Sequence, residues 1–506
     1  MSRLDVRLVP AAVAAWAVTA AGIIWGLGLA LAVLSAGMGI SWALAGRWLP
    51  DRVPLLRAGA AGVLGVALVG AGFGVAAALR SDAVRHHPLG ARVGQTDQVN
   101  LIAVDSPRPI GSGRLLFRGD LNRVGQAPMT GAVVVFAPGL DFGQLSAGQP
   151  VSFRARIARP ARRDLTVAAL TAVGPPQFGR PSTVQRAARA VRQRFAAACR
   201  AALPADHAAM LPGLVLGDTA AVSAVTTAEF RTAGLTHLTA VSGANVTIVC
   251  GAVLLSAGLV GPRAAVVLAA LALVAFVVVV QPTASVLRAA VMGAISLMAV
   301  VSGRRRQAVP VLAATVLALL VAAPQLAVDL GFALSVSATA ALVTLAPVWS
   351  ARLVCRGWPK PLAAAVCVAV AAQLVTAPLV AAISGRFSVV AVLANLVVAL
   401  VIPPITVIGT AAAALVALWP GGAELLIRFT GPEVWWLLWV ARTAAALPGA
   451  AVAVPTGWVG MLTVGGVSLA VIALVRLGSG RWLWLAAAGA MLCAAAWSVS
   501  GAVGGP

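Results

Sequence analysis

The sequence predicts an all-α polytopic membrane protein of about 11–13 transmembrane helices, with a small β-barrel domain inserted after the third. Three observations support this fold class. The chain has 506 residues, of which 60% are hydrophobic and 10% are charged. Runs of 18 or more nearly uncharged residues recur along it, and about 20 such residues span a bilayer as a helix. Between residues 80 and 205 these runs give way to short alternating segments.

Three apolar runs at the N-terminus predict a first group of transmembrane helices over residues 1–79. The first run is too long for the short apolar core of a cleavable signal peptide, so we expect an N-terminal anchor. Three arginines, Arg47, Arg52 and Arg57, follow the second run, and the positive-inside rule places their loop in the cytoplasm. The runs are 10–28, 29–46 and 58–79.

Residues 80–180 predict a basic β-rich domain outside the cytoplasm. From Val151 onward, apolar side chains alternate with Arg154 and Arg156, which is the period of a strand with one buried face. Five short strands suit an OB-like barrel, a fold that commonly binds nucleic-acid strands. The alternative is a small sandwich that only spaces the transmembrane helices apart. The strand-like stretches are 98–104, 112–118, 131–136, 151–158 and 165–173.

Residues 181–205 predict a basic amphipathic helix, in which Ser182 and Gln185 have the spacing of a capping box. Such a helix would lie at the membrane surface, or else pack as a solvated helix on its own domain. Residues 80–205 hold 18 arginines and six aspartates, and long exported segments escape the positive-inside rule. We therefore attribute this charge to an anionic ligand. The candidate nucleic-acid-binding residues are Arg154, Arg156, Arg186 and Arg189.

Ten further apolar runs follow, forming a helical core over 206–417 and C-terminal transmembrane helices over 418–506. One topology places every short basic loop in the cytoplasm and residues 80–205 outside. Pro403 and Pro404 indicate that one run forms a broken pair of helices. The runs are 236–260, 264–281, 284–302, 308–323, 327–347, 362–383, 387–417, 433–448, 457–475 and 482–501.

A polar block, TAGLTHLTAVSGANV at residues 232–246, stands where the first of these runs begins. Its glycines, threonines and serine permit close backbone approach or local unwinding, as in the discontinuous helices of transporters. We interpret the block as lining the place where a charged polymer enters. The alternative is close packing of small residues between helices.

Three carboxamides, Asn245, Gln373 and Asn395, fall at comparable depths in their predicted spans. Unpaired polar groups cost several kcal/mol in hydrocarbon, so we expect the three to meet near the midplane. The alternative for each is an ordinary hydrogen bond between helices.

Charged side chains at the outer ends of the predicted spans could rim an external vestibule. Arg288 is the strongest candidate for touching phosphate, with a structural ion pair to Asp329 as the alternative. The predicted channel-lining residues are Asp218, Arg231, His237, Ser242, Asn245, Arg288, Asp329, Gln373 and Asn395.

The same residues resemble a known family. Gly217-Asp218, followed by F-R-x-x-G-L-x-H-L-x-A-x-S-G at residues 230–243, is similar to a block of the ComEC family of DNA-internalisation competence proteins. PTASVLRAAVM at 282–292, DLGFALSVSAT at 329–339 and the segment from Gln373 to Pro403 resemble that family in order. The resemblance spans about 206–405 and implies a plasma-membrane channel that takes up DNA, one strand passing inward, during natural transformation.

Two departures from the family pattern limit what the resemblance implies. Asn245 stands where the family often has a second histidine, so a role for that histidine does not carry over. Many members also carry a metallo-β-lactamase-like domain proposed as the nuclease, whereas the four histidines here form no HxHxDH cluster. We therefore expect no metal site and no cofactor. Since no Walker A motif occurs, an external DNA receptor, a separate nuclease and a cytosolic ATP-driven motor are the expected partners.

Two other functions remain as alternatives: an intramembrane serine hydrolase and a transporter of another anionic substrate. His237 and Ser242 are five residues apart, about 500° around a helix, so they do not share a face. Ala240 stands where a GxSxG elbow has its first glycine. The sequence therefore predicts a channel rather than an enzyme.

Overall fold

The computed structural model describes residues 5–48, 54–110, 113–239, 241, 243–257, 261–280, 284–301 and 307–477. The chain is mostly helical and divides into two compact units that alternate along the sequence. The first unit comprises Met1–Val191 and Val274–Phe332, and the second comprises Arg192–Leu273 and Ala333–Pro506. The predicted core at 206–417 therefore contributes to both units. Ser242 and the predicted span 482–501 lie outside the described residues.

The first unit begins with three packed apolar helices, α1 (Val9–Trp25), α2 (Gly28–Trp48) and α3 (Pro54–Arg85). They match the three predicted spans, although α3 continues past residue 80 into the predicted insert. Helices α2 and α3 approach closely at Gly28 and Gly74, where a Cβ on Gly28 would lie 2.8 Å from the carbonyl oxygen of Gly74. Small residues of this kind let the backbones of membrane helices touch.

The helical part of the first unit also contains α11 (Ala284–Val301), α12 (Ala308–Ala322) and the 3-10 helix η2 (Pro324–Val328). Trp16 on α1 donates its indole Nε1–H to the carbonyl oxygen of Ala327, at 2.8 Å. Its ring also lies 5.2 Å from that of Phe332. These contacts join the N-terminal helices to a segment about 310 residues away. No local sequence pattern predicts such a contact.

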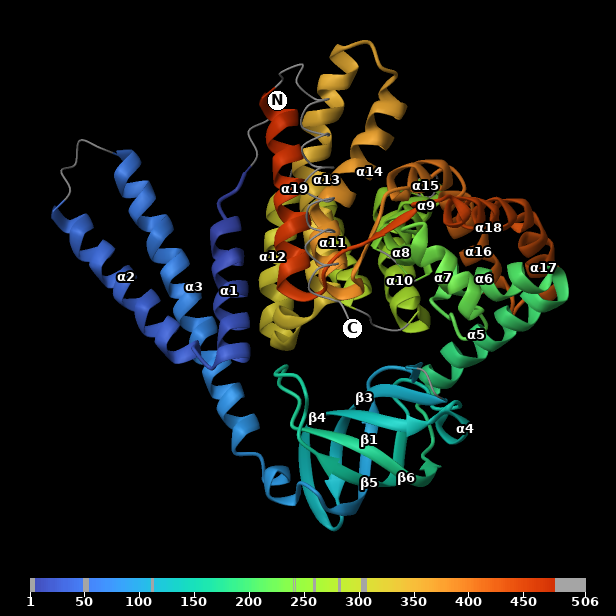
Figure 1. Ribbon diagram of the computed structural model, residues 1–506, viewed down its shortest axis with the longest axis horizontal. Helices are drawn as coiled ribbons and strands as arrows, with labels where there is room; N and C mark the ends of the chain where they lie inside the picture. The colour runs from blue at the N-terminus through green and yellow to red at the C-terminus, as the bar shows by residue number, and fades with distance from the viewer. Residues whose placement is uncertain are drawn as a thin grey trace, which may run out of the picture. The chain divides into compact units, whose positions relative to one another are not determined.

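A closed barrel follows α3 and the short helix η1 (Pro88–Arg92) (Figure 1). Its strand order is β1-β5-β6-β4-β3, and the pairing of β1 with β3 closes the ring, while β2 adds to β3. All pairs are antiparallel except β4 with β6. The five predicted strands are confirmed. The strands are β1 (Thr96–Ala103), β2 (Arg108–Pro109), β3 (Arg114–Val124), β4 (Ala127–Pro138), β5 (Pro150–Ala158) and β6 (Ala168–Phe178).

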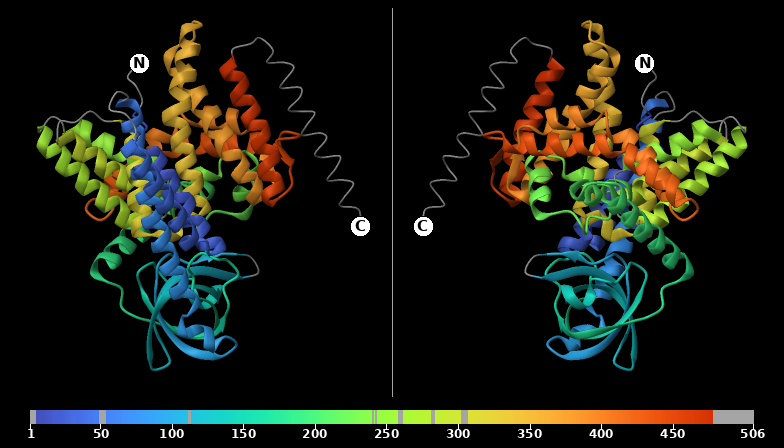
Figure 2. Two further views of the ribbon diagram at one scale, coloured as in Figure 1. Left: turned by 90° about the vertical axis from the view of Figure 1, so that its left-hand side faces the viewer. Right: turned by 90° about the vertical axis from the view of Figure 1, so that its right-hand side faces the viewer.

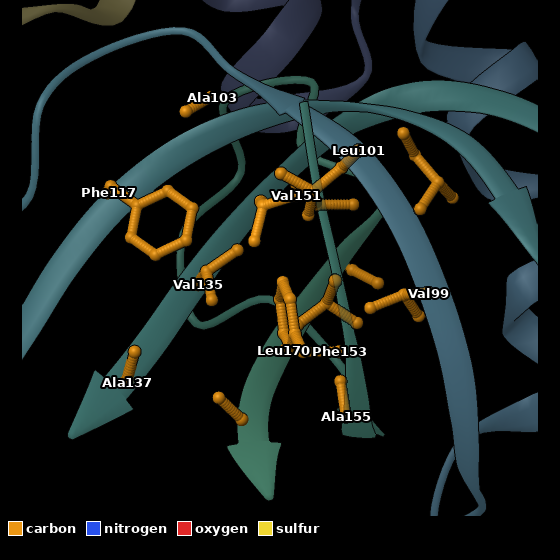
Figure 3. Close-up of a cluster of buried hydrophobic side chains, with 14 of the residues drawn as sticks. Val99, Leu101, Ala103, Phe117, Val135, Ala137, Val151, Phe153, Ala155 and Leu170 are labelled. Atoms are coloured by element: carbon orange, nitrogen blue, oxygen red, sulfur yellow. The ribbon is translucent and has the colours of Figure 1, made fainter. Parts of the chain in front are cut away.

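The barrel encloses one apolar core, and its strands curve around it in both views of Figure 2. Phe142, from the short helix α4 (Gly139–Phe142), packs edge-on against Phe153, with ring centroids 5.1 Å apart. Figure 3 shows Phe153 among Val99, Leu101 and Leu170 from neighbouring strands. On β5 every second residue is buried, as its alternating sequence predicts, so Arg154 and Arg156 point outward.

From α5 onward the described chain is almost entirely helical, with two short strands that pair with each other. Ser182 and Gln185 confirm the capping box of α5: each side chain accepts a hydrogen bond from the other's backbone N–H, at 3.0 and 3.3 Å. The elements are α5 (Thr183–Ala202), α6 (Ala205–Leu216), α7 (Ala224–Thr232), α8 (Thr236–Thr239), α9 (Gly243–Ala257), α10 (Pro262–Val280), α13 (Leu330–Cys355), α14 (Lys360–Ser384), β7 (Arg386–Ser388), α15 (Ala391–Val398), α16 (Ile402–Leu415), α17 (Pro420–Phe429), α18 (Gly431–Ala446), β8 (Ala451–Ala453) and α19 (Gly457–Leu477).

Among the described residues, four helices are long and apolar enough to cross a membrane: those at α3, α10, α13 and α14. Helices α15 and α16 meet at a 53° bend and count as a fifth span if taken together, which confirms the predicted broken pair. Six shorter apolar helices accompany them. These helices suggest a multi-pass membrane protein. The predicted span 236–260 is wrong as one continuous helix: its described residues include two helices, α8 and α9, and Val241 between them is not helical.

Candidate functional site

The polar block and the Gly217-Asp218 pair that precedes it lie in the second unit. The pair belongs to the loop between α6 and α7. Helix α6 ends at Gly217, whose φ of 74° is left-handed and whose N–H donates to the carbonyl oxygen of Gly213. Asp218 follows, and its Oδ1 accepts the N–H of Ala220 at 3.3 Å. Ser223 then caps α7 by accepting the N–H of Thr226 at 3.0 Å. The Gly-Asp pair therefore shapes the loop between two helices, with Asp218 half-buried.

Between α7 and α8 the chain reverses at Gly234, which adopts a φ of 72°. A Cβ added to Gly234 would lie 2.4 Å from the Cβ of Ala391 on α15, closer than real Cβ atoms approach. Glycine is required here both for the left-handed backbone and for the close contact. The predicted lining residues Arg231 and His237 flank this turn, and both are exposed.

The break between α8 and α9 changes the predicted position of Asn245. It stands in the first turn of α9 rather than deep in one continuous helix. Its side chain is buried and donates from Nδ2 to the carbonyl oxygen of Leu214 on α6, at 2.9 Å. Asn245 thus ties α9 to α6, while the neighbouring Ser242 lies outside the described residues.

The other two carboxamides bind carbonyl oxygens on different elements. Asn395 donates from Nδ2 to the carbonyl oxygen of Ala391 at 2.8 Å and to that of Gly234 at 3.4 Å. Gln373 donates from Nε2 to the carbonyl oxygen of Ser388 at 3.5 Å. The three carboxamides therefore bind separate carbonyl groups: Asn395 that of the Gly234 turn, Gln373 that of Ser388 on β7, and Asn245 that of Leu214 on α6.

Ser388 completes this arrangement, and the sequence analysis missed it. Its Oγ donates to the carbonyl oxygen of Thr232 at 2.7 Å. Thr232, Gly234, Gln373, Ser388 and Asn395 together form what we call the turn network, which links α7, α14, β7 and α15. A lone serine in a three-residue strand carries no periodic signal, so only the fold reveals its role.

A second missed feature is an ion cluster on α6, α7 and α18. Arg442 on α18 lies 2.6 Å from Asp206, measured from Nη2 to Oδ2, and its Nε lies 3.8 Å from Oε2 of Glu229. Burial lowers the pKa of the adjacent His207 below its ordinary value. The charge of Asp206 opposes this shift in the pKa, and that of Arg442 adds to it. Charged residues on the largely apolar helices α6 and α18 were the signal that could have revealed the cluster.

Arg288 and Asp329 lie in the first unit, and they form no ion pair with each other. Arg288 is buried on α11, with its Nη1 3.3 Å from the sulfur of Met292. Asp329 instead accepts the backbone N–H of Phe332 at 2.7 Å, which caps the start of α13. The structural alternative for Arg288 is therefore wrong, because the carboxylate is used by a helix N-terminus.

On the barrel, Arg154 and Arg156 are exposed on β5, opposite Gln98 and Thr96 of β1. On α5, Arg186 is exposed and Arg189 is half-buried. The sequence analysis missed three exposed arginines in the loop between β5 and β6: Arg159, Arg162 and Arg163. Their loop has no secondary-structure period, so their exposure was not predictable; Arg163 also donates to the carbonyl oxygen of Ile24 on α1, at 3.2 Å.

No cluster of three or more histidine, cysteine, aspartate or glutamate residues suited to a metal ion occurs in the part of the chain that the structure describes. No curated protein and no solved structure matches the chain. A family model described as Competence protein matches residues 214–479, more than half of the chain. The match begins at the end of α6 and covers the polar block, the turn network and the ion cluster's Arg442. The chain therefore belongs to the Competence protein family.

Proposed function

We propose that this protein is a ComEC-type plasma-membrane channel, which takes up DNA during natural transformation and passes one strand into the cytoplasm. The observation that carries the proposal is the family match over residues 214–479, which falls on the polar block and the turn network. This part of the second unit combines an interrupted apolar helix with exposed Arg231 and His237. Interrupted helices expose backbone N–H groups, which favour anions such as phosphate.

The sequence predicted that the three carboxamides line the channel, whereas in the structure they bond to the backbone. Gln373, Asn395 and Asn245 all donate to backbone carbonyl oxygens, so they hold turns and helix ends in place. We propose that they fix the geometry of the channel wall, while Asp218, Arg231 and His237 face the substrate. Arg288 on α11 contributes a buried positive charge in the first unit.

The barrel is proposed to be OB-like and to gather DNA outside the cytoplasm. Five strands close in a non-sequential order, with β4 and β6 parallel, and a short helix follows β4, which suits a Greek-key barrel of that kind. Its outward-pointing Arg154 and Arg156, with the loop arginines beyond them, supply a basic surface. Arg186 and Arg189 on α5 extend the positive charge along the chain.

The chain is proposed to act without a catalytic site or a cofactor of its own. Strand degradation and energy then come from partners: an external DNA receptor, a separate nuclease and a cytosolic ATP-driven motor. The purified protein should not degrade DNA with or without divalent metal. Nuclease activity that copurifies and disappears on substitution of His237 or Asp218 would contradict this part of the proposal.

The test is deletion of the gene in its host, followed by measurement of labelled DNA. The proposal expects that entry of label into the cytosol is lost while binding of DNA at the cell surface persists, and that a plasmid copy restores entry. Normal entry of DNA in the deletion strain would refute the proposal. Transport of a different anion that excess DNA does not inhibit would favour the alternative transporter.

A further inference from the structure

An open cavity of about 330 Å³ lies beside the turn network in the second unit. Strand β8 and the loop before it form most of the wall, and Thr232 and Arg386 close the side nearest the network. The lining residues are Thr232, Arg386, Ala445, Leu447, Gly449, Ala450, Ala451 and Ala453. The volume is at the lower end of the range for small-molecule sites, which is about 300–1,000 Å³.

Arg386 is the one charged residue in this lining. Within the residues that the structure describes, its guanidinium has no hydrogen-bond or ion-pair partner. The carboxylates of Asp206 and Glu229, on α6 and α7, lie within ion-pair distance of Arg442. The positive charge of Arg386 is therefore not neutralised by any ion pair among the described residues, and an anion is the ligand that complements it.

The rest of the lining indicates which part of an anionic polymer fits. Alanines and one glycine dominate, so a bulky chain can approach the walls closely. No aromatic ring is present in the lining, so a nucleic-acid base would find no stacking partner there. The cavity suits a sugar-phosphate group rather than a base.

The cavity is also held firmly. Arg386 pairs with Ala453 in the β7–β8 ribbon, and Ser388 on the same strand is bonded to Thr232. Gln373 holds the carbonyl group of Ser388 from α14. Because these contacts fix the backbone on both walls, less backbone entropy is lost when a ligand binds.

We propose that this cavity binds a phosphodiester group of single-stranded DNA through Arg386, without selecting its sequence. The inference rests on the proposed function, since it takes DNA as the source of the phosphate. Phosphate chemistry is shared by free phosphate and by phospholipid headgroups, and the experiment separates the three sources.

The experiment uses the full-length protein in phosphatidylcholine nanodiscs and a short fluorescent oligothymidylate. All variants are made in an Arg154→Ala/Arg156→Ala background, so that binding by the barrel is reduced. Arg386→Ala should weaken binding about tenfold, because it removes a charge-assisted hydrogen bond. It should also lower the salt slope by about 0.7, the value for one phosphate contact to a single strand. The affinity of Arg386→Lys should lie between that of the parent and that of Arg386→Ala, since lysine keeps the charge and loses the planar fork.

Two further variants guard against misfolding and against a general charge effect. Ala453→Glu places a carboxylate directly across the ribbon from Arg386, which remains present, and should weaken binding as Arg386→Ala does. Arg428→Ala removes an exposed arginine on α17 that does not line the cavity, and should leave affinity unchanged.

The outcomes separate this inference from the proposed function. If the protein binds the oligonucleotide and every Arg386 variant equals its parent, the cavity is not the site, and the channel proposal stands. If DNA uptake survives gene deletion, the channel proposal fails first and this inference fails with it.

Inorganic phosphate that displaces the oligonucleotide completely at constant ionic strength would identify free phosphate as the ligand. If Arg386→Ala and its parent bind the oligonucleotide equally in phosphatidylglycerol nanodiscs, the ligand is a lipid headgroup. Either of these two results overturns the assignment to DNA.

Discussion

Ser388 donates a hydrogen bond from its Oγ to the carbonyl oxygen of Thr232, at 2.7 Å and across 156 residues of sequence. The bond joins β7, which follows α14, to the end of α7. It also closes the turn network on the side where Arg386 lines the cavity. Ser388 and Thr232 both lie within the region that matches the Competence protein family, so the bond joins two segments of that region.

Removing this bond should destabilise the second unit. Ser388→Ala leaves the half-buried Thr232 without this donor and should lower the free energy of unfolding by about 1–2 kcal/mol. Thr376→Val is the matched control, because the Thr376 hydroxyl bonds only to a carbonyl four residues back in α14. Chemical denaturation in detergent measures both variants. Equal stability of Ser388→Ala and the unaltered protein would show that the bond is dispensable.

The turn at Gly234 should not tolerate a side chain. Gly234→Ala forces a β-carbon into a backbone with a φ of 72° and to within 2.4 Å of the Cβ of Ala391, so we expect a loss of about 1–3 kcal/mol. Adding Ala391→Gly should recover the part due to the collision, while the backbone strain persists. Gly251→Ala on α9, where nothing lies within 4 Å, should be neutral or slightly stabilising. Thermal unfolding of the three variants provides the measurement.

If Asp329 caps α13, its substitutions should change stability differently from those of a residue that pairs with Arg288. Asp329→Asn retains an oxygen that accepts the N–H of Phe332, so stability should change little. Asp329→Ala removes the acceptor and should cost about 0.5–2 kcal/mol. Asp329→Asn should also fail to rescue any defect of Arg288→Ala. A clear rescue would mean that the two side chains interact after all.

Stability should depend on pH through His207. Its pKa is lowered chiefly by burial, so below about pH 6.5 the unfolded chain binds more protons at this site than the folded protein does. The free energy of unfolding should therefore fall as the pH drops below about 6.5, and His207→Gln should reduce that fall. Arg442→Ala should raise the pKa of folded His207 toward that of the unfolded chain and so make this fall smaller. Denaturation curves from pH 5 to pH 8 check this; a pH profile identical in His207→Gln would contradict it.

Binding of single-stranded DNA by the barrel should be electrostatic. Replacing Arg154 and Arg156 together with alanine should lower the slope of log affinity against log salt by about 1.4, or about 0.7 for each phosphate contact. Arg118→Ala is the control, since its Nε is already held by Asp105 at 3.0 Å and contributes less to a ligand. Fluorescence anisotropy on residues 80–205 measures the slopes. Affinity that does not respond to salt would exclude arginine–phosphate contacts as its source.

The sequence alone predicted the elements whose signal is local. Alternation along β5 placed Arg154 and Arg156 on the outside of the barrel, since successive side chains of a strand point to opposite faces. The spacing of Ser182 and Gln185 predicted the cap of α5, because both partners lie within one turn. Pro403 and Pro404 likewise marked the bend between α15 and α16. The family of the polar block was also recognisable from its residues.

Only the tertiary structure decided which groups these residues contact. Asn245, Asn395 and Ser388 all bind backbone carbonyl oxygens that lie between 31 and 161 residues away. Every residue carries such an oxygen, so no side-chain pattern in the sequence distinguishes the one that will be bonded. Asp329 illustrates the same limit, because an aspartate before a helix can either cap it or pair with a nearby arginine. The choice depends on where the folded chain places the competing partners, and that information is not local.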